Sequence, residues 1–259
     1  MTIDKRFNND GFIIIKKAID LEVLEQLENS IKALAEFISG ENDVSPQLLF
    51  KKIEKKDKKL FYDLCSFPGG FISSKQISTS KNIINALKAI YLENFIFLQP
   101  TIMSLFYNEK STKRLQYKWH QESSYFQGIK TGFHLWFPVF SNIKSDNGPM
   151  LIAKGSHKFQ FDYVIEKKKN SVTQLFVEKN IEKRFEIIEC CCNRGDAIIF
   201  DHKTVHCTGK IMSNIPRIAG IIRYVDTLNS GFFEEQITAN NTSKNESRVE
   251  KWKRKTVLE

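Results

Sequence analysis

The stretch Tyr-Lys-Trp-His-Gln-Glu-Ser-Ser-Tyr-Phe, residues 117–126, decides how the rest of the chain is interpreted. It places His120 and Glu122 two residues apart, and on an extended strand such side chains point to the same face. An imidazole and a carboxylate on one face supply two of the ligands of a transition-metal site. The site then needs a third ligand from elsewhere in the chain.

The third ligand is expected in the segment 201–209, where His202 and His206 compete for the role. His206 is favoured because Thr208 follows it at the same-face spacing and Arg217 lies a short turn and part of a strand further on. Two imidazoles and one carboxylate bind one side of an ion and leave other positions open. This is the facial arrangement of non-haem Fe(II) oxygenases.

The other two histidines, His134 and His157, are predicted to be structural. His134 lies in an apolar run and His157 in a turn-like stretch, Gly-Ser-His-Lys at 155–158. A lone histidine in a strand is more often a hydrogen-bonded structural residue than a ligand. For His120, its pairing with Glu122 and a second histidine in another predicted strand favour ligation instead.

Arg217 is expected deep in a strand, where an unpaired guanidinium is costly to bury. A carboxylate co-substrate could supply the partner, because it accepts two hydrogen bonds from the guanidinium fork. The alternative is a salt bridge to a protein acid. Arg223 is a weaker competitor for the same role.

Length and composition favour one globular domain. The chain has 259 residues, 41% of them hydrophobic and 21 of them Phe, which is enough for a well-filled core. No linker interrupts the middle of the chain. We therefore expect a single domain over residues 1–239, followed by a polar tail over residues 240–259.

The net charge of +9 suits an acidic partner in principle. The lysines are spread widely, however, and acids interrupt their densest run at residues 51–59, so a solvated surface is the better interpretation. Nucleic acid is an unlikely partner on this ground. Five cysteines without a paired pattern, no apolar leader and no membrane-length apolar run predict a reduced, cytoplasmic setting without membrane contact.

The second half of the chain is a succession of short β segments separated by turns. This texture, without regular helices between the strands, predicts a mainly β fold, a double-sheet jelly roll with flanking helices, rather than βαβ units. The expected strands are residues 101–107, 115–122, 132–140, 150–153, 185–192, 196–200, 205–208 and 217–224.

The first hundred residues are expected to be mostly helical. A turn and a short strand over 7–15 precede a helix that begins after an N-cap at Asp20 and stops at Gly40. Residues 41–80 are polar and broken by Pro and Gly, which predicts short helices and a mobile loop. A second helix over 83–90 and a strand over 94–98 follow.

These motifs together resemble the phytanoyl-CoA dioxygenase family of Fe(II)/2-oxoglutarate oxygenases. The resemblance runs from about residue 7 to residue 226, and its strength lies in the order and spacing of the motifs. They are Asp-Gly-Phe at 10–12, Trp-His-Gln-Glu at 119–122, Tyr-Phe at 125–126, Trp-Phe-Pro at 136–138, Asn-Gly-Pro-Met at 147–150, Gly-Ser-His-Lys at 155–158, Gly-Asp at 195–196, His-Cys-Thr-Gly at 206–209, Arg217 and Arg-Tyr at 223–224.

The resemblance implies a double-stranded β-helix with helices packed outside it. It implies that His120, Glu122 and His206 bind the iron, and that Arg217 with Thr208 binds the distal carboxylate of 2-oxoglutarate. The sequence departs from the family at one ligand: Glu122 stands where the usual member has Asp. Related halogenases have a small residue there, so the carboxylate of Glu122 argues against halogenation.

The expected activity is hydroxylation of an unactivated C–H bond in a small metabolite or biosynthetic intermediate. The cofactor and co-substrates implied are Fe(II), 2-oxoglutarate and O2, with release of succinate and CO2. The wall of the substrate pocket is predicted to come from residues that flank the ligand strand: Gln116, Tyr117, Tyr125, Phe126 and Trp136. The alternatives are a non-catalytic, metal-capable β-barrel binding protein and, ranked last, a nucleic-acid demethylase.

Overall fold

The computed structural model describes residues 2–92, 95–101, 103–111, 116–125, 129, 131–166, 174–177 and 180–227. Phe126 and the predicted tail over residues 240–259 lie outside these residues. Among the described helices, none is both long and apolar enough to cross a bilayer.

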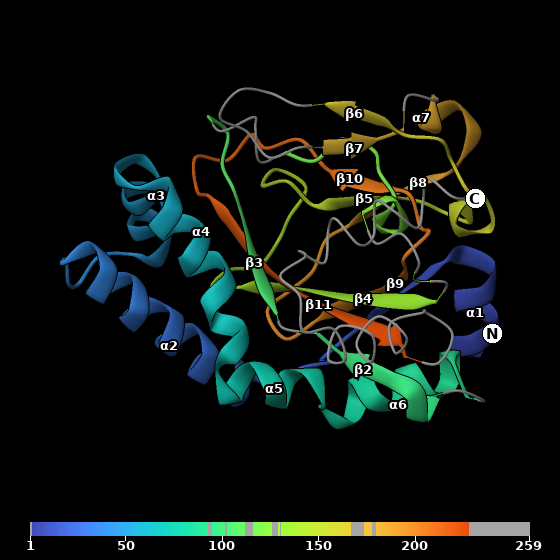
Figure 1. The fold of residues 1–259 in the computed structure, drawn as a ribbon, viewed down its shortest axis with the longest axis horizontal. Helices are drawn as coiled ribbons and strands as arrows, with labels where there is room; N and C mark the ends of the chain where they lie inside the picture. The colour runs from blue at the N-terminus through green and yellow to red at the C-terminus, as the bar shows by residue number, and fades with distance from the viewer. Residues whose placement is uncertain are drawn as a thin grey trace, which may run out of the picture.

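The longest strand, β11 (Arg217–Asp226), lies in the middle of a six-stranded antiparallel sheet (Figure 1). One edge of β11 pairs with β4 (Gly132–Val139), and the other pairs with β2 (Leu98–Pro100) and β3 (Ser104–Asn108). β4 pairs in turn with β9 (Ala197–Asp201), and β9 with β1 (Phe12–Ile15). We call this the major sheet.

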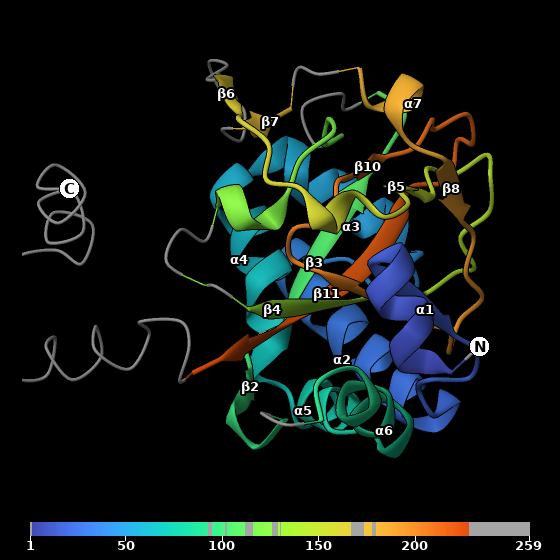
Figure 2. The ribbon, with the colours of Figure 1, turned by 90° about the vertical axis from the view of Figure 1, so that its right-hand side faces the viewer.

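A smaller sheet faces the major one. In it β5 (Met150–Ala153) lies between β10 (His206–Thr208) and β8 (Ile187–Cys190). An isolated bridge between His120 and His206 widens the sheet by one extended segment. A two-stranded ribbon, β6 (Val164–Glu166) with β7 (Gln174–Phe176), lies beyond it. Figure 2 shows the smaller sheet on one side of the major sheet and helices α5 and α6 on the other.

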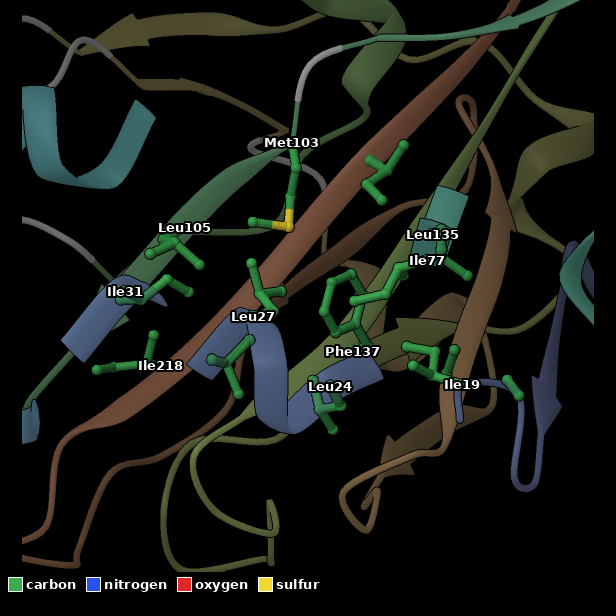
Figure 3. Close-up of a cluster of buried hydrophobic side chains, with 14 of the residues drawn as sticks. Ile19, Leu24, Leu27, Ile31, Ile77, Met103, Leu105, Leu135, Phe137 and Ile218 are labelled. Atoms are coloured by element: carbon green, nitrogen blue, oxygen red, sulfur yellow. The ribbon is translucent and has the colours of Figure 1, made fainter. Parts of the chain in front are cut away.

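Alternation along the strands gives the major sheet two different apolar faces. Leu135 and Phe137 of β4, with Ile218 of β11, pack against the helices in the largest core cluster (Figure 3). Their neighbours Trp136 and Ala219 point the other way, into a second cluster between the sheets. The predicted jelly roll is therefore confirmed, with the space between its sheets available for a site.

Helix α2 (Leu21–Ser39) has the ends that the sequence predicts. The Asp20 side chain accepts a 2.9 Å hydrogen bond from the amide of Glu22, and Gly40 ends the helix with a left-handed φ of 74°. The other helices are α1 (Ile3–Asp10), α3 (Pro46–Lys56), α4 (Lys58–Ser66), α5 (Ile72–Ser78), α6 (Lys81–Ile90) and α7 (Ile181–Arg184). Short 3-10 turns are η1 (Phe67–Gly70), η2 (Phe95–Phe97), η4 (Glu122–Ser124) and η5 (Ser156–Lys158).

Several predictions for the first half of the chain were wrong. Residues 7–10 end helix α1 instead of forming a turn. Residues 46–78 form the predicted short helices, but with short breaks where a loop was expected, because apolar side chains such as Leu49 and Phe61 at helical spacing are buried in the main core. Residues 95–97 form a 3-10 turn, so the strand predicted over 94–98 is confined to the start of β2.

In the second half, the predicted strands over 132–140, 150–153, 185–192, 196–200, 205–208 and 217–224 correspond to β4, β5, β8, β9, β10 and β11. The strand predicted over 101–107 begins later, as β3 at Ser104. The strand predicted over 115–122 is wrong for its described residues: only His120 forms a bridge, and Glu122 opens a 3-10 turn.

Candidate active site

The two histidines of the predicted triad lie directly opposite each other between antiparallel segments. The amide of His120 donates to the carbonyl of His206, and the amide of His206 donates to the carbonyl of His120, each at 3.0 Å. This pairing brings the imidazole centroids to 4.2 Å from each other. The histidine positions are thus set by main-chain pairing.

Each imidazole is also oriented by a hydrogen bond from its Nδ1–H. His120 donates to the carbonyl of Lys118 at 2.7 Å, and His206 donates to that of Thr204 at 2.9 Å. A backbone carbonyl only accepts, so Nδ1 carries the proton and Nε2 keeps its lone pair. Metal-binding histidines commonly have this arrangement, in which the outer nitrogen fixes the ring.

Glu122 completes the cluster as the first residue of η4. Its Oε1 lies 3.7 Å from Nε2 of His120 and 3.8 Å from Nε2 of His206, and all three side chains are buried. Two atoms that each lie about 2.1 Å from one ion can be at most about 4.2 Å apart. The three donors therefore fit around a single ion, and they form the one group of metal-capable side chains found among the described residues.

The protonation states also suit a metal. Burial alone raises the pKa of the Glu122 carboxyl, but the facing His134 and Arg223 side chains and the contact with His120 outweigh it and hold that pKa well below its usual range. Burial, reinforced by His120, lowers the pKa of His206 to about 3. At neutral pH the carboxyl is therefore ionised and His206 is neutral, as metal ligation requires.

Arg217 lies in the same pocket, at the start of β11. Its guanidinium donates to the carbonyl of Gly148 and to Oδ1 of Asn108, and it lies 5.4 Å from the ring of Trp136. Gly148 has a φ of 77°, and a Cβ there would come within 2.7 Å of Ile211, so the turn that offers this carbonyl requires glycine.

No carboxylate among the described residues lies within ion-pair distance of Arg217, although its side chain is buried. Burial lowers the pKa of its guanidinium to about 9, so Arg217 still carries its charge at neutral pH. A buried cation held only by neutral acceptors is suited to an anionic ligand. The alternative of a salt bridge to a described protein acid is thereby excluded.

The cluster and Arg217 line one hollow between the two sheets, part of it open to solvent. Thr208 is on its wall, and its Oγ1 accepts a 3.2 Å hydrogen bond from the amide of Tyr117. The lining residues are Phe106, Tyr117, His120, Glu122, Trp136, Met150, His206, Cys207, Thr208, Arg217 and Ile221.

Of the predicted pocket-wall residues, Tyr117 and Trp136 line this hollow, and two others do not. Gln116 donates instead to the carbonyl of Glu109, and the hydroxyl of Tyr125 accepts from the amide of Leu175. Both were placed on the wall because a continuous strand was assumed. The chain bends at Glu122, which changes the direction of the side chains on either side of it.

The residues that competed for these roles in the sequence lie elsewhere or make other contacts. His202 is buried outside the metal-capable group, and His157 faces the carbonyl of Asn8. His134 was predicted to be purely structural, yet its Nδ1 lies 3.9 Å from Oε2 of Glu122. Arg223 was considered for the co-substrate, but its Nε lies 3.6 Å from that same oxygen.

Sequence reasoning missed the two acceptors of Arg217 and much of the wall. Asn108 is the last residue of β3 and belongs to no distinguishing motif. The main-chain carbonyl of Gly148 cannot be identified from the sequence, because every residue has one. Only the pairing of β3 with β11, which sets Asn108 opposite Arg217, reveals the first contact. The missed wall residues are Phe106, Met150, Cys207 and Ile221.

A jelly roll with two histidines and a carboxylate on the wall of one hollow has the layout of the cupin-like, non-haem iron oxygenases. The family model for phytanoyl-CoA dioxygenase (PhyH) matches residues 7–219. The chain therefore belongs to the phytanoyl-CoA dioxygenase family. No curated protein matches it in sequence.

Solved structures share the fold at low identity. The epimerase SnoN, in complex with Fe3+, alpha ketoglutarate and nogalamycin RO, is 14% identical with a TM-score of 0.60, over 87% of this chain and 82% of that one. EvdO2 from Micromonospora carbonacea var. aurantiaca is 15% identical with a TM-score of 0.61, over 86% and 89%. EctD from S. alaskensis, with bound Fe, is 14% identical with a TM-score of 0.55, over 87% and 76%.

Proposed function

We propose that this protein is an Fe(II)/2-oxoglutarate-dependent oxygenase that hydroxylates an unactivated C–H bond of a small metabolite or biosynthetic intermediate. The observation that carries the proposal is the presence, in one hollow, of three converging metal donors and a buried arginine without a described acid partner. The three donors are suited to a metal cation, and the arginine is suited to an organic anion. A 2-oxo diacid fits both, because its 2-oxo acid end can chelate the metal and its other carboxylate can pair with the arginine.

In this proposal His120, Glu122 and His206 hold the metal through Nε2, a carboxylate oxygen and Nε2. Fe(II), when bound with 2-oxoglutarate and O2, supplies the oxidant that takes hydrogen from the substrate, while the 2-oxo acid leaves as succinate and CO2. The iron- and alpha ketoglutarate-bound SnoN and the iron-bound EctD support this choice of cofactors. Glu122 keeps a carboxylate in the site and so argues against halide binding.

Arg217 and Thr208 bind the distal carboxylate of 2-oxoglutarate. Arg217 stays charged at neutral pH, and its position is fixed by Gly148 and Asn108. The Oγ1 of Thr208 already accepts a hydrogen bond from Tyr117, which leaves its O–H to donate to a ligand. Both groups act by binding and orientation, and neither moves a proton.

The apolar side chains of Phe106, Trp136 and Ile221 line the remaining wall and keep water from the reacting atoms. The protein itself carries out little acid–base chemistry. Its contribution is to hold the substrate C–H bond against the open side of the metal.

The test is succinate release by anaerobically purified protein loaded with Fe(II), then mixed with 2-oxoglutarate, O2 and a panel of small metabolites. We expect slow release without substrate and faster release with the right metabolite. His206→Ala should abolish both. A chain that binds metal but releases no succinate across the panel is a binding protein, and the proposal fails.

Mass analysis of the product then identifies the outcome. Hydroxylation adds one oxygen atom to the substrate, whereas an epimerisation, the reaction named for SnoN, leaves its mass unchanged. Desaturation and cyclisation each remove two hydrogens. The proposal predicts the added oxygen.

A further inference from the structure

The two oxygens of Glu122 face different partners. Oε1 faces Nε2 of His120 at 3.7 Å and Nε2 of His206 at 3.8 Å. Oε2 lies 3.6 Å from Nε of Arg223 and 3.9 Å from Nδ1 of His134. The carboxylate thus bridges the metal-capable group and two residues of the major sheet.

Strand register places these two residues side by side. Arg223 of β11 and His134 of β4 are direct partners across the antiparallel pair. Directly opposed side chains on one face have Cβ atoms about 5 Å apart, so both can reach a single carboxylate oxygen. Ala219 and Ile221 lie at even spacing from Arg223 and belong to the inter-sheet cluster, which puts Arg223 on the same face.

The His134 ring is held by packing. It stacks on Phe200 with centroids 5.2 Å apart and planes at 23°, and Phe200 in turn packs on His206 at 4.7 Å. Phe200 and His134 are themselves register partners on β9 and β4. One aromatic ring therefore fixes both a metal-capable histidine and the histidine that faces the carboxylate.

We propose that Arg223 and His134 are positioning residues that hold Oε2 of Glu122, so that Glu122 offers the metal Oε1 alone. This inference rests on the proposed function and deepens it. Three single donors would leave room on the ion for a chelating 2-oxo acid and O2. A carboxylate that offered both oxygens to the ion would take up part of that room.

The same contact gives a physical reason for Glu where the family resemblance leads one to expect Asp. Glu122 starts from a 3-10 turn next to the smaller sheet, and its outer oxygen reaches the major sheet. Removing one methylene shortens the side chain by about 1.5 Å. An aspartate can then contact the metal or the Arg223–His134 pair, but not both.

The first experiment uses Co(II), whose absorption reports its coordination, in full-length protein carrying Arg223→Gln or His134→Phe. His134→Phe keeps an aromatic ring stacked on Phe200 and removes the ring nitrogen that faces Glu122. Loss of such an outer partner typically costs 10- to 100-fold in metal affinity, so we expect Co(II) to bind at least about tenfold more weakly by calorimetry. The Co(II) spectrum in the presence of 2-oxoglutarate should change as well.

Lys154→Gln is the matched control, because it removes one positive charge from a surface pair with Glu186, 2.9 Å away and remote from the metal-capable group. It should change neither affinity nor spectrum. Thermal unfolding of each apoprotein checks the fold, and His134→Phe carries the test if Arg223→Gln does not fold. Arg223→Lys should recover part of the lost affinity.

A double-mutant cycle separates positioning from a general effect of charge. In a Glu122→Asp background the carboxylate no longer spans both partners, so adding Arg223→Gln should change Co(II) affinity little. Additive losses overturn the inference, as do unchanged affinity and spectrum in both single variants. Wild-type protein that binds neither Co(II) nor 2-oxoglutarate overturns the proposed function too, which distinguishes the two failures.

Discussion

At the residue scale, the site consists of a few side chains whose positions and ring orientations are fixed by hydrogen bonds to the main chain. His120 and His206 are paired through their amides, and each ring is fixed by a carbonyl. The spacing of His120 and Glu122 identified both from sequence, although the strand that justified the spacing does not form. Asn108 and the carbonyl of Gly148 could not be foreseen, since they meet Arg217 only through pairing and turn geometry.

Thr208→Val tests the hydroxyl at the same scale. The change is nearly isosteric and removes one hydrogen bond to a charged carboxylate, so the KM for 2-oxoglutarate should rise about tenfold, measured by succinate release. Thr204→Val is the matched control, because its buried hydroxyl donates to the carbonyl of Gly11 in the scaffold. It should lower stability and leave that KM unchanged. Equal effects of both variants on KM count against a ligand contact at Thr208.

The pH dependence of 2-oxoglutarate binding tests Arg217. Burial lowers the pKa of its guanidinium to about 9, so the free site is cationic at neutral pH and loses its proton as the pH rises through about 9. Affinity for 2-oxoglutarate in metal-loaded protein should therefore be constant below pH 8 and fall above it. Calorimetry between pH 7 and pH 9.5 measures this, with metal affinity alone as the control. A constant affinity over that range contradicts the role of Arg217.

The sign of the linked effect on stability follows from the same shift. Above about pH 9 the unfolded chain holds the Arg217 proton more tightly than the folded one. The free-energy cost of burying this charged group is therefore full below pH 9 and shrinks as the pH rises further. At neutral pH, an anion bound to Arg217 should relieve part of that penalty. Binding of 2-oxoglutarate thus stabilises the fold as well as the complex.

At the element scale, elements with a clear apolar pattern were predictable and elements with a concealed one were not. β5 matches its expected range as a short apolar run, and helix α2 matches its range because its apolar stripe follows a 3.6-residue pattern between two caps. Helices α3 and α4 were missed in part, since their Lys-rich surface concealed the apolar positions that reach the core. η4 replaces the end of a predicted strand, and its first residue, Glu122, contacts His120 and His206 on one side and Arg223 on the other.

The cap of α2 gives a test at this scale. Asp20→Ala removes the hydrogen bond to the amide of Glu22 and should lower the free energy of unfolding by about 1 kcal/mol. Ser45→Ala is the control, because Ser45 precedes α3 without a side-chain hydrogen bond to its first turn. Urea unfolding measures both. A larger loss for Ser45→Ala than for Asp20→Ala is the contrary result.

At the scale of the whole molecule, the site is the place where two sheets face each other. The smaller sheet and its neighbouring segment bring His120 and His206, while the major sheet brings Arg217, Arg223 and His134. Helices α5 and α6 lie on the opposite side of the major sheet from the smaller sheet (Figure 2). The jelly roll was predictable from the succession of short strands separated by turns. The convergence of ligands from distant segments was not, because predicting it requires the register of every strand between them.

The central claim is that one hollow binds a metal and an organic diacid together. Anaerobic titration of 2-oxoglutarate into Fe(II)-loaded protein, followed by visible absorption, tests it most directly, because a 2-oxo acid chelated to Fe(II) gives a charge-transfer band. We predict a saturable band with one 2-oxoglutarate per chain, lost in His206→Ala and weakened in Arg217→Met. Absence of the band from wild-type protein that has bound both Fe(II) and 2-oxoglutarate would contradict the claim.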